Sequence, residues 1–214
     1  MQEVFSIGEA LSFGWTKLKE NSAVLLSGSV IIFALNLISS WASKSFEDGG
    51  FGIIGLLLVI ASIIVSIGYM IISLKVSRGE AVSIKDIIPP GKIGFNVFLV
   101  SILAGIIVVA GLILLIIPGI YLALRFMMTS YAVVDGAGIK ESFSRSTHLT
   151  DGHKWQLLGF CIVLCLVNIL GAIPFGLGLL VTTPITAVAA AHVYNKLKHA
   201  HHAAHGDHAE HSHA

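Results

Sequence analysis

The stretch FGIIGLLLVIASIIVSIGYMIISL, residues Phe51–Leu74, decides the fold of this 214-residue chain. Its 24 residues include no Asp, Glu, Lys, Arg or His. Roughly 20 helical residues, at a rise of about 1.5 Å each, cross the hydrocarbon core of a bilayer. A helix also satisfies its own backbone hydrogen bonds in lipid. We therefore expect residues 51–74 to form a membrane-spanning helix.

The whole chain has the composition of a membrane protein. Hydrophobic residues make up 55% of it and charged residues 12%, whereas soluble domains carry about 25% charged residues. Its apolar segments predict an all-α membrane protein with six transmembrane segments in three hairpins. The expected spans are residues 23–41, 51–74, 97–117, 120–134, 155–173 and 175–194.

Turn-forming residues separate the two spans of each expected hairpin. They lie at residues 42–50, at Pro118–Gly119 and at Pro174, where proline removes a backbone donor and interrupts a helix. We expect one polytopic membrane domain over residues 1–198 and a His-rich disordered tail over residues 199–214.

Basic residues predict the orientation of this domain. Eleven of the thirteen Lys and Arg residues lie in segments that share one side of the six-span arrangement. The other side has Lys44 alone, and Arg125 lies within a span. Because cytoplasmic loops are enriched in Lys and Arg, we expect both termini to be cytoplasmic.

Residues 7–19 and 139–149 predict amphipathic helices at the membrane surface. Their first residues, Ser6–Glu9 and Gly138–Glu141, share a small–Ile–x–acid pattern with Ser83–Asp86. Ser6 and Glu9 have the spacing of a capping box. One hypothesis is three repeated units, each an interfacial helix followed by a hairpin. The alternative is that any segment entering a bilayer has this amphipathic character.

Arg125 is the strongest candidate for a functional side chain. An arginine within a span costs at least about 2.5 kcal/mol on insertion scales, so it faces protein, water or an anion. The expected partners are the hydroxyls of Thr129 and Ser130, carbonyls freed by Pro118, or a lipid phosphate. We therefore predict a lipid- or anion-binding site at Arg125, Thr129 and Ser130. The alternative is a structural clamp, or a side chain that extends to the interface.

Few other polar residues lie within the expected spans. Asn36, Asn168 and the threonines around Pro184 can bond between helices or line a solute path. Cys161 and Cys165 lie four apart in an apolar helix, which is more typical of packing residues than of a metal or redox pair.

Seven histidines lie within fifteen residues of the C-terminal segment. Neutral imidazoles bind transition metals, so the tract predicts loose binding of Zn or Ni. We expect no other cofactor. The alternative is a flexible polar tail without a metal. The residues concerned are His199, His201, His202, His205, His208, His211 and His213.

Three stretches give the chain a family resemblance. They are FSIGEALSFGWTKLKEN from Phe5, Ile117–Ile120 leading to Arg125, and the segment 141–152. The chain resembles a small bacterial integral-membrane family of uncharacterised function, similar to the membrane domain associated with glycerophosphoryl diester phosphodiesterases. The resemblance implies a multi-pass protein of the bacterial inner membrane. It implies no hydrolysis, because the catalytic domain of those enzymes has no counterpart here.

The sequence contains no nucleophile elbow, zinc-protease motif or phosphate-binding loop, so we expect no enzyme. The leading expectation is a non-enzymatic membrane scaffold or lipid-interacting accessory protein. The alternative is a small-solute or metal-linked transporter or channel. Expected partners are membrane lipids and either a protein partner or a second copy of the chain. The dispersed basic residues argue against nucleic acid.

Overall fold

The computed structural model describes residues 4–45, 53–173 and 176–210, with side chains except at 41–45, 53, 54, 56, 202 and 204–210. Within these residues the chain is all-α, as predicted, and forms no strand. The helices are α1 (Ile7–Glu20), α2 (Ser22–Ser45), α3 (Ile53–Ser77), the short 3-10 helix η1 (Ile84–Ile87), α4 (Gly91–Leu114), α5 (Ile116–Phe126), α6 (Thr129–Val134), α7 (Ile139–Thr150), α8 (Lys154–Ala172) and α9 (Leu179–Glu210).

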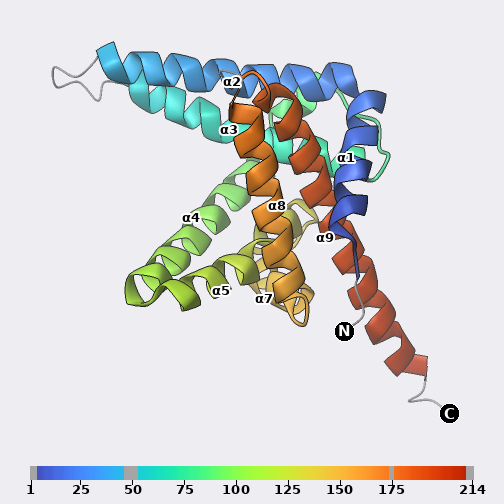
Figure 1. Cartoon of the computed structure of the whole chain (residues 1–214). Coiled ribbons are helices and arrows are strands. Elements are labelled where there is room, and N and C mark those ends of the chain that lie inside the picture. Colours follow the sequence, from blue (N-terminus) through green and yellow to red (C-terminus); the bar gives the residue numbers. More distant parts are fainter. Residues whose placement is uncertain (1–3, 46–52, 174–175, 211–214) are drawn as a thin grey trace.

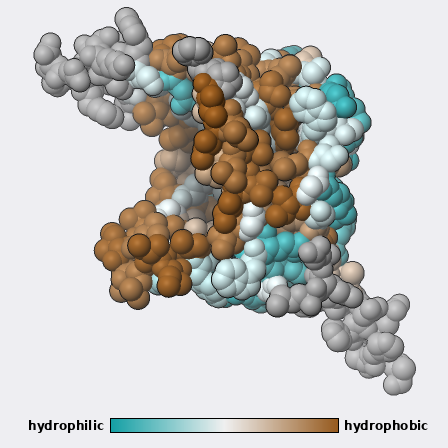
Figure 2. All heavy atoms as spheres, viewed as in Figure 1, coloured by the Kyte–Doolittle hydropathy of each residue, from teal (hydrophilic) through white to brown (hydrophobic). Residues whose placement is uncertain are grey.

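Consecutive helices pack side by side in three pairs, α2 with α3, α4 with α5, and α8 with α9. The α2–α3 and α4–α5 pairs diverge from each other toward their far ends (Figure 1). Helix α9 contacts α1, α2, α3, α7 and α8, so it lies at the centre of the packing. Hydrophobic residues cover α4, α5 and α8, while hydrophilic residues gather near α1 and α7 (Figure 2).

Five segments are long and apolar enough to cross a membrane. They are Ser22–Ser40, Leu57–Ser77, Gly91–Leu114, Ile116–Val134 and Lys154–Ala172. Five of the six expected spans therefore have a counterpart. Helix α9 is not among the five. Its apolar residues are interrupted by Thr182, Thr183, Pro184, Thr186, His192 and Asn195.

The turn between α4 and α5 lies at Leu115, three residues before the predicted Pro118–Gly119 turn. Leu115 alone is extended, and Pro118 lies in the first turn of α5, where a missing N–H leaves no hydrogen bond unmade. A Cβ at Gly119 would overlap Leu112. Gly119 therefore allows the two helices to approach closely, and the proline does not interrupt the helix.

The other two predicted turns lie largely outside the residues that the structure describes. Residues 46–52, which include most of the expected 42–50 turn, and Pro174 lie outside the described residues. The expected short span 120–134 begins earlier than predicted, at Ile116, and reaches 19 residues with a break between α5 and α6.

A helix replaces the disordered tail that the sequence predicted for residues 199–210, since α9 continues to Glu210. Extending an existing helix needs no new nucleus, and Ala200, Ala203, Ala204 and Ala209 have high helix propensity. Residues 211–214 lie outside the described part of the chain.

The small–Ile–x–acid pattern begins a helix at each of its three occurrences, α1, η1 and α7. Asp86 accepts from the Ser83 backbone N–H at 3.0 Å, and Glu141 accepts from the Gly138 N–H at 3.4 Å. The Ser83 hydroxyl also caps its helix. The Ser6 hydroxyl does not, so the capping box predicted at Ser6 is incomplete.

Candidate functional site

Arg125 lies near the C-terminal end of α5 and faces α7. Its Nε donates to the Thr147 hydroxyl at 3.2 Å, and its Nη1 donates to the Tyr121 hydroxyl at 3.3 Å. The Ser146 hydroxyl donates to the Arg125 carbonyl oxygen at 2.8 Å. Two adjacent residues of α7 therefore fix both the backbone and the guanidinium of Arg125.

Lys154, the first residue of α8, reaches the same phenol. Its Nζ donates to the Tyr121 hydroxyl at 2.9 Å and lies 4.6 Å from the centroid of the Tyr121 ring. The Arg125 guanidinium carbon lies 5.9 Å from that centroid. Two cationic side chains from different helices thus converge on one neutral aromatic residue, which is 39% exposed.

Asp151 is the acid that accompanies this pair of cations. It forms an ion pair with Lys154 at 2.9 Å, and Arg125 has no carboxylate within ion-pair distance among the described residues. The hydrogen bond from Lys154 holds the pKa of Asp151 below its ordinary value, and the charges of Arg125 and His148 add to the effect. One carboxylate accompanies two permanent cations, which leaves excess positive charge for an anion.

Thr129 and Ser130 have partners other than Arg125. The Thr129 hydroxyl donates to the Phe126 carbonyl at 2.8 Å, and the Ser130 hydroxyl lies 3.3 Å from that of Ser101. Serine and threonine hydroxyls in helices commonly bond backbone carbonyls one turn earlier, which explains the Thr129 contact. The structure therefore groups Arg125 with Tyr121, Thr147 and Lys154.

Sequence reasoning missed Tyr121 and Lys154 as members of this site. Tyr121 lies four residues before Arg125, and that spacing places both side chains on one helix face. This signal is present in the sequence. The approach of Lys154 depends on how α8 packs on α5, which no local spacing reveals.

A second polar centre, at Asp135, joins three helices. One carboxylate oxygen of Asp135 accepts from Arg78 Nη2 at 2.5 Å, and the other accepts from Lys198 Nζ at 2.6 Å and the Tyr194 hydroxyl at 2.9 Å. The Asp135 side chain is 4% exposed, whereas those of Arg78 and Lys198 are about one-third exposed. The carboxylate therefore connects the ends of α3 and α6 to α9.

The pKa of Asp135 records this environment. Burial alone raises the pKa, but hydrogen bonds from Lys198, Arg78 and Tyr194 outweigh it and bring the pKa below its ordinary value. Asn195 extends the network, because its side-chain amide accepts from Arg78 Nε at 3.2 Å and donates to the Ser77 hydroxyl at 2.8 Å. With its carboxylate fully occupied, this centre is suited to holding helices together.

The polar residues of the spans are divided between different helix pairs. Asn36 borders a groove with serines of α3 and α4, and its amide donates to the Ile32 carbonyl at 2.9 Å. The Asn168 amide donates to the Thr186 hydroxyl at 3.3 Å, which joins α8 to α9. They do not form one mid-membrane site of the kind typical of transporters.

The histidine tract gives no metal centre within the described residues, where no group of three or more His, Cys, Asp and Glu side chains could hold an ion. The His201 ring lies 6.3 Å from that of His148. The side chains of His202, His205 and His208, and all of His211 and His213, lie outside the described residues. The Cys161 sulfur lies 3.5 Å from that of Met127, which is a packing contact.

The apolar helices and their basic ends define a multi-pass α-helical membrane protein. A family described as a domain of unknown function (DUF7847) matches residues 48–204, and the chain belongs to this family. The match includes Arg125, Asp135 and Lys154, and leaves out α1 and α2. No curated protein and no solved structure matches the chain.

Proposed function

We propose that this protein is a non-enzymatic, lipid-interacting scaffold or accessory protein that binds the phosphate of an anionic membrane lipid. The binding residues are Arg125, Lys154 and Tyr121. The observation that carries the proposal is the convergence of the two cations on the Tyr121 hydroxyl, at 3.3 and 2.9 Å. Both cations already donate to one oxygen atom, so a phosphate placed beside the Tyr121 hydroxyl can accept from the same two side chains.

The position of these residues supports a headgroup as the anion. Lys154 begins one candidate span, and Arg125 lies at the middle of another, one residue before α5 ends. Tyrosine is enriched at membrane–water interfaces, and the planar guanidinium of arginine matches phosphate oxygens in a two-point contact. Acyl chains anchor a lipid phosphate at the membrane, whereas a soluble anion has no such anchor.

The proposal includes a membrane topology. We infer six spans, with α9 as the sixth, and both termini in the cytoplasm of a bacterium whose inner membrane holds the protein. The convergence of Arg78 and Lys198 on Asp135 supports this, since it brings basic ends of α3 and α9 to one place. We also infer that α1 and α7 lie at the cytoplasmic surface. The likeness to the membrane domain of glycerophosphoryl phosphodiesterases belongs to this proposal too.

The test is a lipid titration of the purified full-length chain in mild detergent, followed by native mass spectrometry. Phosphatidylglycerol and phosphatidylcholine with the same acyl chains serve as anionic and neutral probes. A hydrogen bond to a charged group contributes about 1.5–3 kcal/mol, so Arg125→Gln should weaken phosphatidylglycerol binding at this site about tenfold or more.

The matched control is Lys140→Gln, which removes one positive charge from an exposed position on α7. Binding in this control should change less than about twofold, as expected for an exposed charge. Equal weakening by both variants, or equal binding of the two lipids by the unmodified protein, would contradict the proposal.

A further inference from the structure

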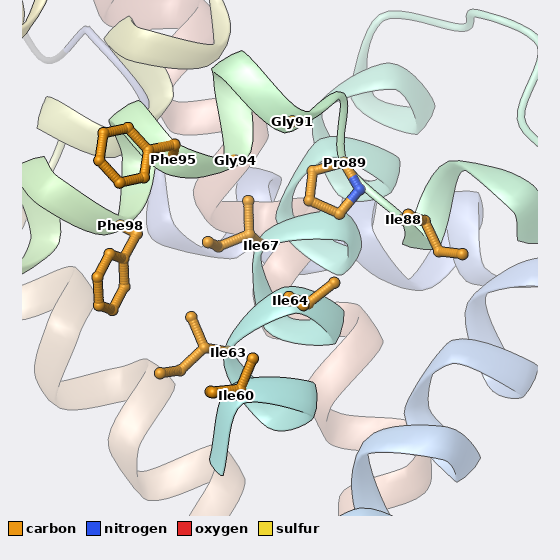
Figure 3. A pocket seen from close by; sticks show the side chains of 10 residues that line it. All are labelled: Ile60, Ile63, Ile64, Ile67, Ile88, Pro89, Gly91, Gly94, Phe95 and Phe98. Carbon is orange, nitrogen blue, oxygen red and sulfur yellow. The ribbon is translucent and has the colours of Figure 1, made fainter. Parts of the chain in front are cut away.

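An apolar groove with a volume of about 480 Å³ opens between α3 and α4, away from Arg125 and its partners. Four isoleucines of α3 form one wall and two phenylalanines of α4 form the other, with Pro89 at one end (Figure 3). These wall residues are Ile60, Ile63, Ile64, Ile67, Phe95 and Phe98. The side chains pointing into this space are therefore almost entirely hydrocarbon.

Two features of the chain keep the groove open. Gly91 and Gly94 border it and have no side chain to fill it. A Cβ at Gly94 would lie 3.1 Å from the Pro89 ring, so this end is closely packed. Farther along, the α4–α5 pair diverges from the α2–α3 pair (Figure 1).

The walls of the groove belong to two candidate spans, Leu57–Ser77 and Gly91–Leu114. In a bilayer the groove therefore opens to acyl chains. Phe95 is 61% exposed and Ile64 is 40% exposed, so large apolar surfaces at the groove have no partner within the described chain.

Two lysines lie close in sequence to Pro89, at one end of the groove. Lys85 and Lys92 flank the Ile88–Pro90 connection and have no acidic partner among the described residues, while the nearby Asp86 is paired with Lys75 at 2.9 Å. An occupant with a hydrocarbon chain and a negative group at one end fits both the apolar walls and this charge. A neutral lipid satisfies only the walls.

We propose that the groove between α3 and α4 binds one acyl chain of an anionic phospholipid, with the phosphate beside Lys92. This inference deepens the proposed function, because it rests on lipid binding by this protein but names a second site on different helices. The site selects the lipid by its charge at the Pro89 end and holds it by chain burial.

Ile64→Trp tests the proposal because the larger ring fills the groove from an exposed wall position. The matched control is Ile113→Trp on α4, where Ile113 is 80% exposed and does not border the groove. Full-length variants in mild detergent are titrated with phosphatidylglycerol and phosphatidylcholine, and bound lipids are counted by native mass spectrometry. Equal melting temperatures of the two variants establish that both are folded.

Ile64→Trp should weaken one phosphatidylglycerol site at least about tenfold, since excluding two methylene groups from an apolar site has that effect. Ile113→Trp should leave it unchanged, and Lys92→Gln should reduce the preference for phosphatidylglycerol over phosphatidylcholine. Unchanged lipid binding in Ile64→Trp would overturn the proposal. So would an equal affinity of this site for both lipids, or a loss of dimer instead of lipid, which would make the occupant a second copy.

The two variants test the two proposed lipid sites independently. Lipid loss in Arg125→Gln but not in Ile64→Trp supports the headgroup site and overturns the groove proposal. Lipid loss in Ile64→Trp but not in Arg125→Gln supports the groove and overturns the headgroup proposal.

Discussion

Replacing Asp135 with asparagine tests whether the three helices that meet at this residue depend on its charge. The substitution keeps the shape of the side chain but removes the negative charge that accepts from Arg78 at 2.5 Å and Lys198 at 2.6 Å. The amide can accept through one oxygen only, and its NH2 group would face donors. Asp135→Asn should therefore loosen the junction of α3, α6 and α9.

The size of the effect follows from the exposure of the partners. Removing one member of a fully buried ion pair costs about 3–5 kcal/mol, whereas exposed pairs contribute about 0–1 kcal/mol. The Asp135 side chain is 4% exposed, but the side chains of Arg78 and Lys198 are 30% and 31% exposed and can regain water. We therefore expect a loss of about 2–3 kcal/mol in the free energy of unfolding.

Thermal unfolding of the protein in detergent micelles measures this loss. For soluble chains of 150–250 residues, each kcal/mol corresponds to about 2–4 °C in melting temperature, so a decrease of roughly 4–12 °C is expected. Glu141→Gln is the control, because its ion pair with Arg145 is exposed at 59% and 34%. It should lower the melting temperature by no more than about 2 °C. If Asp135→Asn melts like the control, the junction does not depend on this carboxylate.

Two further predictions concern stability. The folded-state pKa of Asp135 lies below its ordinary value. Its contribution to the free energy of unfolding is therefore complete above about pH 4 and is lost as the pH falls through the folded pKa. Below pH 4 the stability of the unmodified protein should fall more steeply with pH than that of Asp135→Asn. Gly68→Ala should lower the free energy of unfolding by about 3 kcal/mol or more, since a Cβ there would overlap the Ile87 backbone. The control is Gly55→Ala, which has open space around it and should leave the melting temperature unchanged or slightly higher.

Much of the helical layout could be predicted from the sequence, because it depends on local properties. The apolar stretch 51–74 is matched by α3 within three residues at each end. The helices expected at 7–19 and 139–149 are present as α1 and α7. The turn near Pro118 was misplaced because proline is compatible with the first turn of a helix, so the break came before it.

The polar centres could be predicted only in part. Arg125 is conspicuous because a charge within an apolar stretch is rare. Asp135 follows directly after such a stretch and has the appearance of an ordinary loop acid. Its partners Arg78 and Lys198 are separated from it by 57 and 63 residues. No spacing rule connects residues so far apart in the sequence, so this junction is found only from the packing of the helices.

Helix α9 shows why hydropathy and burial need not agree in a membrane protein. It falls outside the five apolar segments, yet Val188, Ala189, Ala191 and Val193 have no exposed surface. A helix surrounded by lipid must be apolar on its outside, whereas a helix surrounded by other helices needs small residues for close approach. The same enclosure lets α9 carry the polar side chains that reach Asp135, because protein groups there take the place of water. Helix α9, which is not one of the five candidate spans, therefore packs against α1, α2, α3, α7 and α8.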